Sequence, residues 1–188
     1  MKKIFFTLII IVSAFNGFGQ TDPLEKIFDD PEFMPILNLL FTGKLDSCET
    51  LLNKFNDTHP KYESVVYLKS QCHWEQRNYK ELKKDLEYIL PNIDSNNSEY
   101  SNLMNLYGLS QRNTNEKDEA INTFKKAYKI THDQIHLINL IAIYNDLKKY
   151  KESILFESEL SQDTIGNLHF LIGEAFFIYQ SLIKLNNT

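Results

Sequence analysis

Two histidines stand four residues apart in the segment His-Asp-Gln-Ile-His, at His132 and His136. This is the histidine spacing of the H-E-x-x-H zinc motif, in which both histidines bind the metal from one helical turn and the glutamate is the base. Here the shorter Asp133 stands after the first histidine, and an aspartate before a helix is typical of an N-cap. The segment therefore predicts a turn at His132, no metal site and no cofactor.

The other histidines and the two cysteines offer less chemistry. His59, His73 and His169 stand alone in the sequence, and we expect them on the surface or in a groove. Cys48 and Cys72 fall on helices that we expect to be neighbours. Two readings stay open: a disulfide, which needs Cα atoms within about 7 Å of each other, or a small buried thiol at Cys48.

The sequence holds no G-x-S-x-G motif and no phosphate-binding glycine loop, and it has only six glycines in all. Its many carboxylates lie at helix-surface spacing, often near lysines, and need no catalytic role. These observations predict that the chain is not an enzyme.

The first residues are typical of a secretory signal peptide. Lys2 and Lys3 precede an apolar stretch at 4–14, and Gly17-Phe18-Gly19 is a small-x-small cleavage site. We expect residues 1–19 to be removed and 20–30 to form a tether before a helical domain at 31–188. No cysteine lies near the cleavage site, so a lipid anchor is not indicated. We therefore expect the mature chain in the periplasm or outside the cell, without stable membrane insertion.

The formal net charge is −5, and removal of Lys2 and Lys3 changes it to −7. An acidic surface repels phosphate backbones, so nucleic acid is not an expected partner.

The elements that must position any site are helices. Glycine and proline fall between long segments of helical periodicity, which predicts an all-α chain. The predicted helices cover residues 32–42, 46–56, 61–76, 79–90, 98–112, 116–130, 134–147, 150–161 and 166–185.

These helices repeat as pairs. One copy holds Leu106-Tyr107-Gly108 in its first helix and the run DEAINTFKKAYKI, with Ala120 and Phe124, in its second. The next holds Tyr150-Lys151-Glu152-Ser153-Ile154, and earlier copies hold Tyr79-Lys80-Glu81-Leu82 and Leu45-Asp46-Ser47-Cys48. Equating Cys48, Leu82, Ala120 and Ser153 gives intervals of 34, 38 and 33 residues.

This pattern resembles the tetratricopeptide repeat family, whose period is 34 residues. The resemblance covers residues 31 to the C-terminus and implies a right-handed superhelical solenoid of antiparallel helix pairs, with about four repeats. Asn167 to Lys184, with Ile172-Gly173, is similar to the first helix of a fifth repeat, and could close the array or meet a partner.

The resemblance also implies a function. Family members usually hold an extended peptide or a helix in a concave groove lined by the first helices. Asparagines there could bond a peptide backbone without demanding a sequence, although each could equally be an ordinary solvated residue. The residues that alignment places in the groove are Tyr67, Gln71, Trp74, Asn102, Asn105, Leu109, Arg112, Asn113, Ile138, Asn145 and Asp146.

Three functions follow in order of preference. The first is a non-catalytic scaffold of the cell envelope that binds another protein or a peptide in the groove. The second is a sensory or assembly component that binds through the ends of the solenoid, and the third is a hydrolase that uses the His132 and His136 pair.

Overall fold

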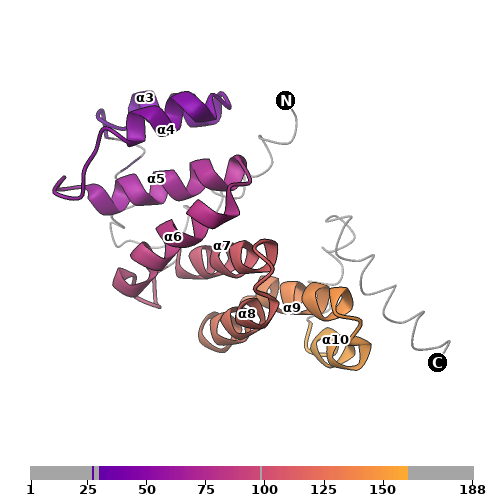
Figure 1. The fold of residues 1–188 in the computed structure, drawn as a ribbon. Coiled ribbons are helices and arrows are strands. Elements are labelled where there is room, and N and C mark those ends of the chain that lie inside the picture. Colours follow the sequence, from indigo (N-terminus) through magenta and orange to yellow (C-terminus); the bar gives the residue numbers. More distant parts are fainter. Residues whose placement is uncertain (1–26, 28–29, 98, 161–188) are drawn as a thin grey trace. The chain divides into compact units, whose positions relative to one another are not determined.

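The computed structural model describes residues 27, 30–97 and 99–160, and this part of the chain is all-helical. It holds eight α-helices and one 3-10 helix, and no strand (Figure 1). None of these helices has the length and apolar character needed to cross a membrane. The expected signal peptide and the helix at 166–185 lie outside the described residues.

The chain divides into two compact units, residues 1–93 and 94–188. In the first unit, α3 packs on α4, α4 on α5 and α5 on α6. In the second, α7 packs on α8, α8 on α9 and α9 on α10, and α7 also contacts α9. The helices of the first unit are α3 (Met34–Phe41), α4 (Leu45–Leu52), α5 (Tyr62–Glu75), α6 (Tyr79–Ile89) and the 3-10 helix η1 (Leu90–Asn92); those of the second are α7 (Tyr100–Asn113), α8 (Lys117–Thr131), α9 (Gln134–Asp146) and α10 (Tyr150–Glu157).

All eight α-helices lie where the sequence predicts them, but two end earlier than expected. α4 ends at Leu52 rather than at 56, and α10 ends at Glu157 rather than at 161. After α4 the Asn56 side chain accepts hydrogen bonds from the backbone N–H and the hydroxyl of Thr58. Such a local turn competes with the helix.

A different turn, with one recurring geometry, joins the two helices of each pair. The pairs are α3 with α4, α5 with α6, α7 with α8, and α9 with α10. A residue with positive φ stands two positions before the second helix in all four pairs: Gly43 (φ 70°), Arg77 (59°), Asn115 (69°) and Lys148 (59°). The next residue has ψ of 61, 67, 61 and 65° in the same order. These positions recur at the intervals of 34, 38 and 33 residues seen in the sequence.

Each turn closes with the same two hydrogen bonds. In the last pair the N–H of Lys149 donates to the carbonyl of Tyr144 at 2.8 Å, and that of Lys148 donates to Asn145 at 3.0 Å. The other three turns make the equivalent bonds. This is the Schellman motif, which satisfies carbonyls that the end of a helix leaves without partners. Four copies of one turn therefore fix the four helix pairs locally.

The four residues equated in the sequence occupy one repeated position, a buried slot on the second helix of each pair. Cys48, Leu82, Ala120 and Ser153 are each the fourth residue of their helix, and each is 0 % exposed. The backbone N–H of each donates to the residue that precedes its helix, at 3.0 or 3.1 Å. The equivalence of these four positions is therefore confirmed within the described residues.

α7 and α8 approach each other closely at Gly108. A Cβ atom at Gly108 would lie 2.5 Å from two ring carbons of Phe124, and that ring is fully buried. The ring packs into a core formed with α9, which is buried along nine consecutive residues, 136 to 144. A helix that is buried all round lies inside its domain, so α9 is the central helix of the described part of the second unit.

We predict that Lys148→Gly stabilises the protein by about 1 kcal/mol, because glycine adopts a positive φ without the steric cost that other residues carry. Chemical unfolding monitored by circular dichroism measures the change. The matched control is Lys151→Gly, an exposed position inside α10, where glycine should instead cost about 1 kcal/mol. A loss of stability in both variants would contradict the assigned turn.

We predict that Gly108→Ala lowers the free energy of unfolding by about 1–2 kcal/mol, because the methyl group overpacks against Phe124 and this outweighs the gain in helix propensity. The penalty should be smaller in a Phe124→Leu background, which a double-mutant cycle measures. Equal penalties in the two backgrounds would show that the close contact with Phe124 is not the cause.

Candidate binding surface

A row of polar side chains crosses from α7 to α9 in the second unit. We call it the polar row, and it consists of Ser101, Asn105 and Arg112 on α7 with His136, Asn139 and Asp146 on α9. The three α7 residues lie four and seven positions apart, so they share one face of the helix. The Asn and Arg contacts each join residues 34 positions apart, one repeat along the chain.

The middle of the polar row is an amide pair. Nδ2 of Asn139 donates to Oδ1 of Asn105 at 2.7 Å and to the carbonyl of Ile135 at 3.0 Å. Asn139 is nearly fully buried, with the apolar residues Ile138 and Leu140 on either side of it in α9. A buried amide needs partners, and here a second asparagine supplies one, while Asn105 itself remains half-exposed.

An ion pair closes one end of the polar row. Nη2 and Nε of Arg112 donate to the same Asp146 carboxylate oxygen, at 2.8 and 3.2 Å. The two side chains remain 22 % and 32 % exposed. Because water reaches both groups, the pair contributes only about 0–1 kcal/mol to stability. Arg112 is therefore held in place without being sealed from solvent.

At the other end of the polar row Ser101 bonds to His136, and also to Asp133 just before α9. The Ser101 hydroxyl donates to Asp133 Oδ2 at 2.7 Å, so its oxygen is left to accept from Nε2 of His136 at 3.0 Å. A serine nucleophile needs the reverse, with its proton directed at the histidine. Burial lowers the pKa of His136, against the charge of Asp133, and favours the neutral ring.

His132 and His136 do not form a ligand pair. His132 is exposed in a left-handed turn (φ 54°) after α8, whereas His136 is buried inside α9. The Asp133 side chain accepts from the N–H of Ile135 at 3.0 Å and caps α9. The predicted turn and N-cap are therefore confirmed. Among the described residues no three His, Cys, Asp or Glu side chains gather as a metal site would require.

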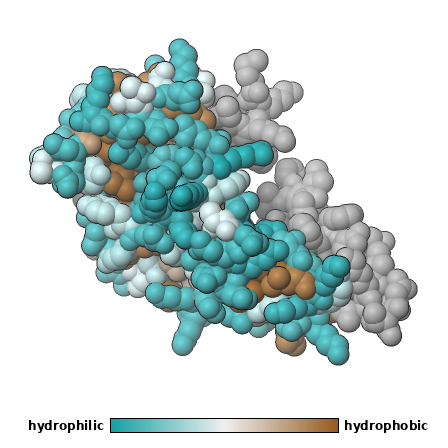
Figure 2. Space-filling model, in the orientation of Figure 1, coloured by the Kyte–Doolittle hydropathy of each residue, from teal (hydrophilic) through white to brown (hydrophobic). Residues whose placement is uncertain are grey.

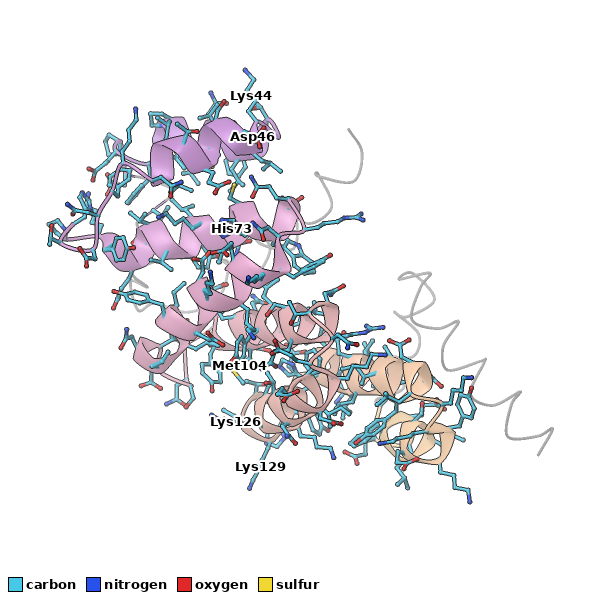
Figure 3. All side chains as sticks on the ribbon, viewed as in Figure 1. Lys44, Asp46, His73, Met104, Lys126 and Lys129 are labelled. Carbon is cyan, nitrogen blue, oxygen red and sulfur yellow. The ribbon has the colours of Figure 1, made fainter. Side chains whose placement is uncertain are left out.

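A second polar cluster lies in the first unit, around His73 of α5, which Figure 3 labels. Nδ1 of His73 lies 2.7 Å from Asp85 Oδ2 on α6, and its Nε2 lies 3.6 Å from Glu49 Oε1 on α4. Gln76 donates to the other oxygen of Glu49 at 3.0 Å. The expectation of a solitary surface or groove histidine was wrong, because His73 is 6 % exposed and joins three helices.

The charge of His73 is set by this environment. Burial lowers its pKa, but the hydrogen bond that His73 donates to Asp85 and the charges of Asp85 and Glu49 together outweigh burial, so the pKa is raised above its ordinary value. The imidazolium is the form that suits two carboxylate neighbours. His59, the other described solitary histidine, lies 3.2 Å from Glu32 and is partly exposed.

His73 and Asp85 occupy one crossing position that recurs in all four pairs. The two residues are 12 apart, as are Gln111 and Thr123, whose side chains bond at 2.7 Å. The matching positions in the last pair are Tyr144 and Phe156, whose rings stack with centroids 5.6 Å apart. In the first pair they are Leu39 and Leu51, which line a shallow hollow. The contact position is constant while its chemistry changes.

The predicted groove residues fall in both units, and each unit is considered by itself. In the first, Tyr67 is buried, Gln71 is half-buried, and Trp74 packs against Tyr79 with ring centroids 6.0 Å apart. In the second unit the structure brings together Asn105, Arg112 and Asp146.

The other five predicted groove residues lie outside the polar row. Asn102 donates to Glu99 at 3.3 Å, and Asn113 is exposed and donates to the carbonyl of Leu109 at 2.8 Å. Ile138 belongs to the core, Leu109 packs against that core, and Asn145 is half-buried. Tyr67 and Ile138 therefore support the helices from within and expose little area to a ligand.

Three members of the polar row were missed, namely Ser101, His136 and Asn139. The usable signal was the placement of His136 and Asn139 inside the otherwise apolar run QIHLINLIAIY. A polar residue among buried ones must find a partner, and the neighbouring first helix is where that partner lies.

No protein-family model, no curated protein and no solved structure matches the chain.

The visible face of the molecule is mostly hydrophilic, with small and separate hydrophobic areas (Figure 2).

We predict that the stabilising contribution of His73 is present in full below its unfolded pKa of about 6.5 and is lost as pH rises through its higher folded pKa. The free energy of unfolding of wild type minus that of His73→Gln should therefore shrink as pH increases. Urea unfolding at a series of pH values measures it, with His132→Asn as the control at an exposed histidine. A difference that is constant or grows with pH would contradict the charged pair.

Proposed function

We propose that the chain is a non-catalytic scaffold that binds a protein segment in extended form on the α7–α9 face of the second unit. The observation that carries the proposal is the polar row, where the partly exposed Asn105 amide and Arg112 guanidinium lie on one face of α7 and bond to Asn139 and Asp146 of α9. Amides offer both a donor and an acceptor to a peptide backbone, and Arg112 offers a directed cation to a carboxylate.

In this proposal the helix pairs are antiparallel and stack as a right-handed solenoid of the tetratricopeptide type. The support is the fourfold recurrence of one closing turn and one buried slot at near-constant intervals. In such arrays the first helices line the concave side, which is where ligands bind. The polar row joins two first helices, as this arrangement requires.

The ion pair of Arg112 and Asp146 can open so that Arg112 binds a ligand instead of Asp146. A ligand carboxylate can replace Asp146 as the acceptor of Arg112 at little cost, because the existing pair is partly solvated. Asp146 is then free to accept a backbone N–H of the ligand. The preferred ligand on this account is an extended segment with one acidic side chain, and not a strongly basic or nucleic-acid partner.

We further propose that the chain is exported and works in the cell envelope, on the grounds of the leader-like residues 1–19. The runner-up is an assembly component that binds through the ends of the array. The observation that favours this alternative is Leu155 on α10, an apolar side chain that is 64 % exposed.

The test is quantitative capture from envelope extract with the chain lacking residues 1–19 as bait. We expect Arg112→Ala combined with Asn105→Ala to weaken capture of the specific partner about tenfold or more, since each bond to a charged group contributes about 1.5–3 kcal/mol. The matched control is Lys126→Ala, which removes one exposed positive charge from α8, a second helix (Figure 3).

Three outcomes separate the proposals. Weakened capture by the double variant alone supports the α7–α9 face. Unchanged capture by that variant, with loss on Leu155→Ser, would favour binding through the end of the array. Equal losses in the double variant and in Lys126→Ala would reduce the effect to net charge and contradict a directed site.

A further inference from the structure

The two cysteines of the chain meet where α4 packs on α5. Both are free thiols and both are 0 % exposed. The sulfur of Cys72 lies 3.4 Å from the carbonyl oxygen of Leu45, the first residue of α4. Cys48 lies three positions after Leu45, on the same face of α4, so both cysteines belong to the contact between α4 and α5.

The surroundings of the two sulfurs are closed to solvent. Cys48 occupies the buried slot of α4, and its sulfur lies 3.7 Å from the carbonyl of Ile36 on α3. The nearest charged groups in this cluster, Glu49 and His73, are the neighbours of the cysteines along their helices, and His73 is engaged by Asp85. Neither thiol is used by the binding surface proposed above.

We propose that Cys48 and Cys72 are a disulfide site that staples α4 to α5, and so joins the first helix pair to the second. Among the described α-helices of the first unit, the two of the first pair are the shortest, with eight residues each. Helices of two turns have little stability of their own and depend on tertiary contacts. A covalent link at this junction therefore stabilises the described helices of the first unit that depend most on tertiary contacts.

The chemistry is thiol–disulfide exchange with a small-molecule disulfide, for which we name oxidised glutathione. One of the two cysteine thiolates attacks one glutathione sulfur and expels the other as a thiolate, which forms a mixed disulfide. The second cysteine thiolate then attacks the protein sulfur of this mixed disulfide and expels the second glutathione as a thiolate. Two protein thiols are oxidised, the glutathione disulfide is reduced to two thiols, and the two protons pass to the glutathione thiolates.

Both sulfurs are sealed from solvent in the folded state. Exchange with glutathione therefore takes place while the chain folds or when α4 separates from α5.

The test starts with the full chain, unfolded and reduced, and refolds it with either oxidised or reduced glutathione. We expect the first sample to resist alkylation after denaturation, to be lighter by two hydrogen atoms, and to yield one peptide pair that holds Cys48 and Cys72. Its melting temperature should exceed that of the reduced sample by about 5–15 °C.

The repeat supplies two control variants that preserve packing. Cys48→Ala copies Ala120 in the equivalent slot, and Cys72→Ser copies the fully buried Ser110 of α7. Both should lose the difference between oxidised and reduced samples. Two alkylatable thiols after oxidative refolding of wild type, links between chains only, or an undiminished melting difference in either variant would each overturn the proposal. The mass measurement needs no variant, so it decides even if a variant fails to fold.

Discussion

The structure depends on one backbone constraint, the left-handed residue that closes each helix pair. Gly43, Arg77, Asn115 and Lys148 hold φ values between 59 and 70°, although only the first is a glycine. Residues other than glycine reach this conformation at a cost, so tertiary packing must hold it. The fourth residue of the following helix, fully buried in every pair, is part of that packing. The left-handed turn and the buried slot therefore both depend on the packing between the two helices of a pair.

Within this constant frame the side chains that cross each pair are free to vary. Leu39 with Leu51, His73 with Asp85, Gln111 with Thr123 and Tyr144 with Phe156 occupy the same position and range from apolar to charged. The charged pair in α5 and α6 makes the first unit sensitive to pH. The polar row likewise joins equivalent positions, which here lie on the neighbouring first helices α7 and α9. It is the feature from which we derive a binding role.

The sequence predicted the local structure well because its signals are local. Helical periodicity, the breaks between helices and the recurrence of Cys48, Leu82, Ala120 and Ser153 placed all eight described α-helices. Contacts between distant polar residues were harder. His73 seemed solitary because Asp85 lies 12 positions away, a spacing that matches neither helix nor strand, and Asn139 finds its partner 34 positions away. Such pairs become visible only once the repeat is aligned.

The most direct test of this account is the backbone conformation at the four turns in solution, from NMR scalar couplings and chemical shifts. The account requires positive φ at Arg77, Asn115 and Lys148 as well as at Gly43. It also requires slow amide exchange at the residue after each, whose N–H closes the turn. Negative φ at any of the three residues that are not glycine, or a continuous helix through one of these turns, would contradict it.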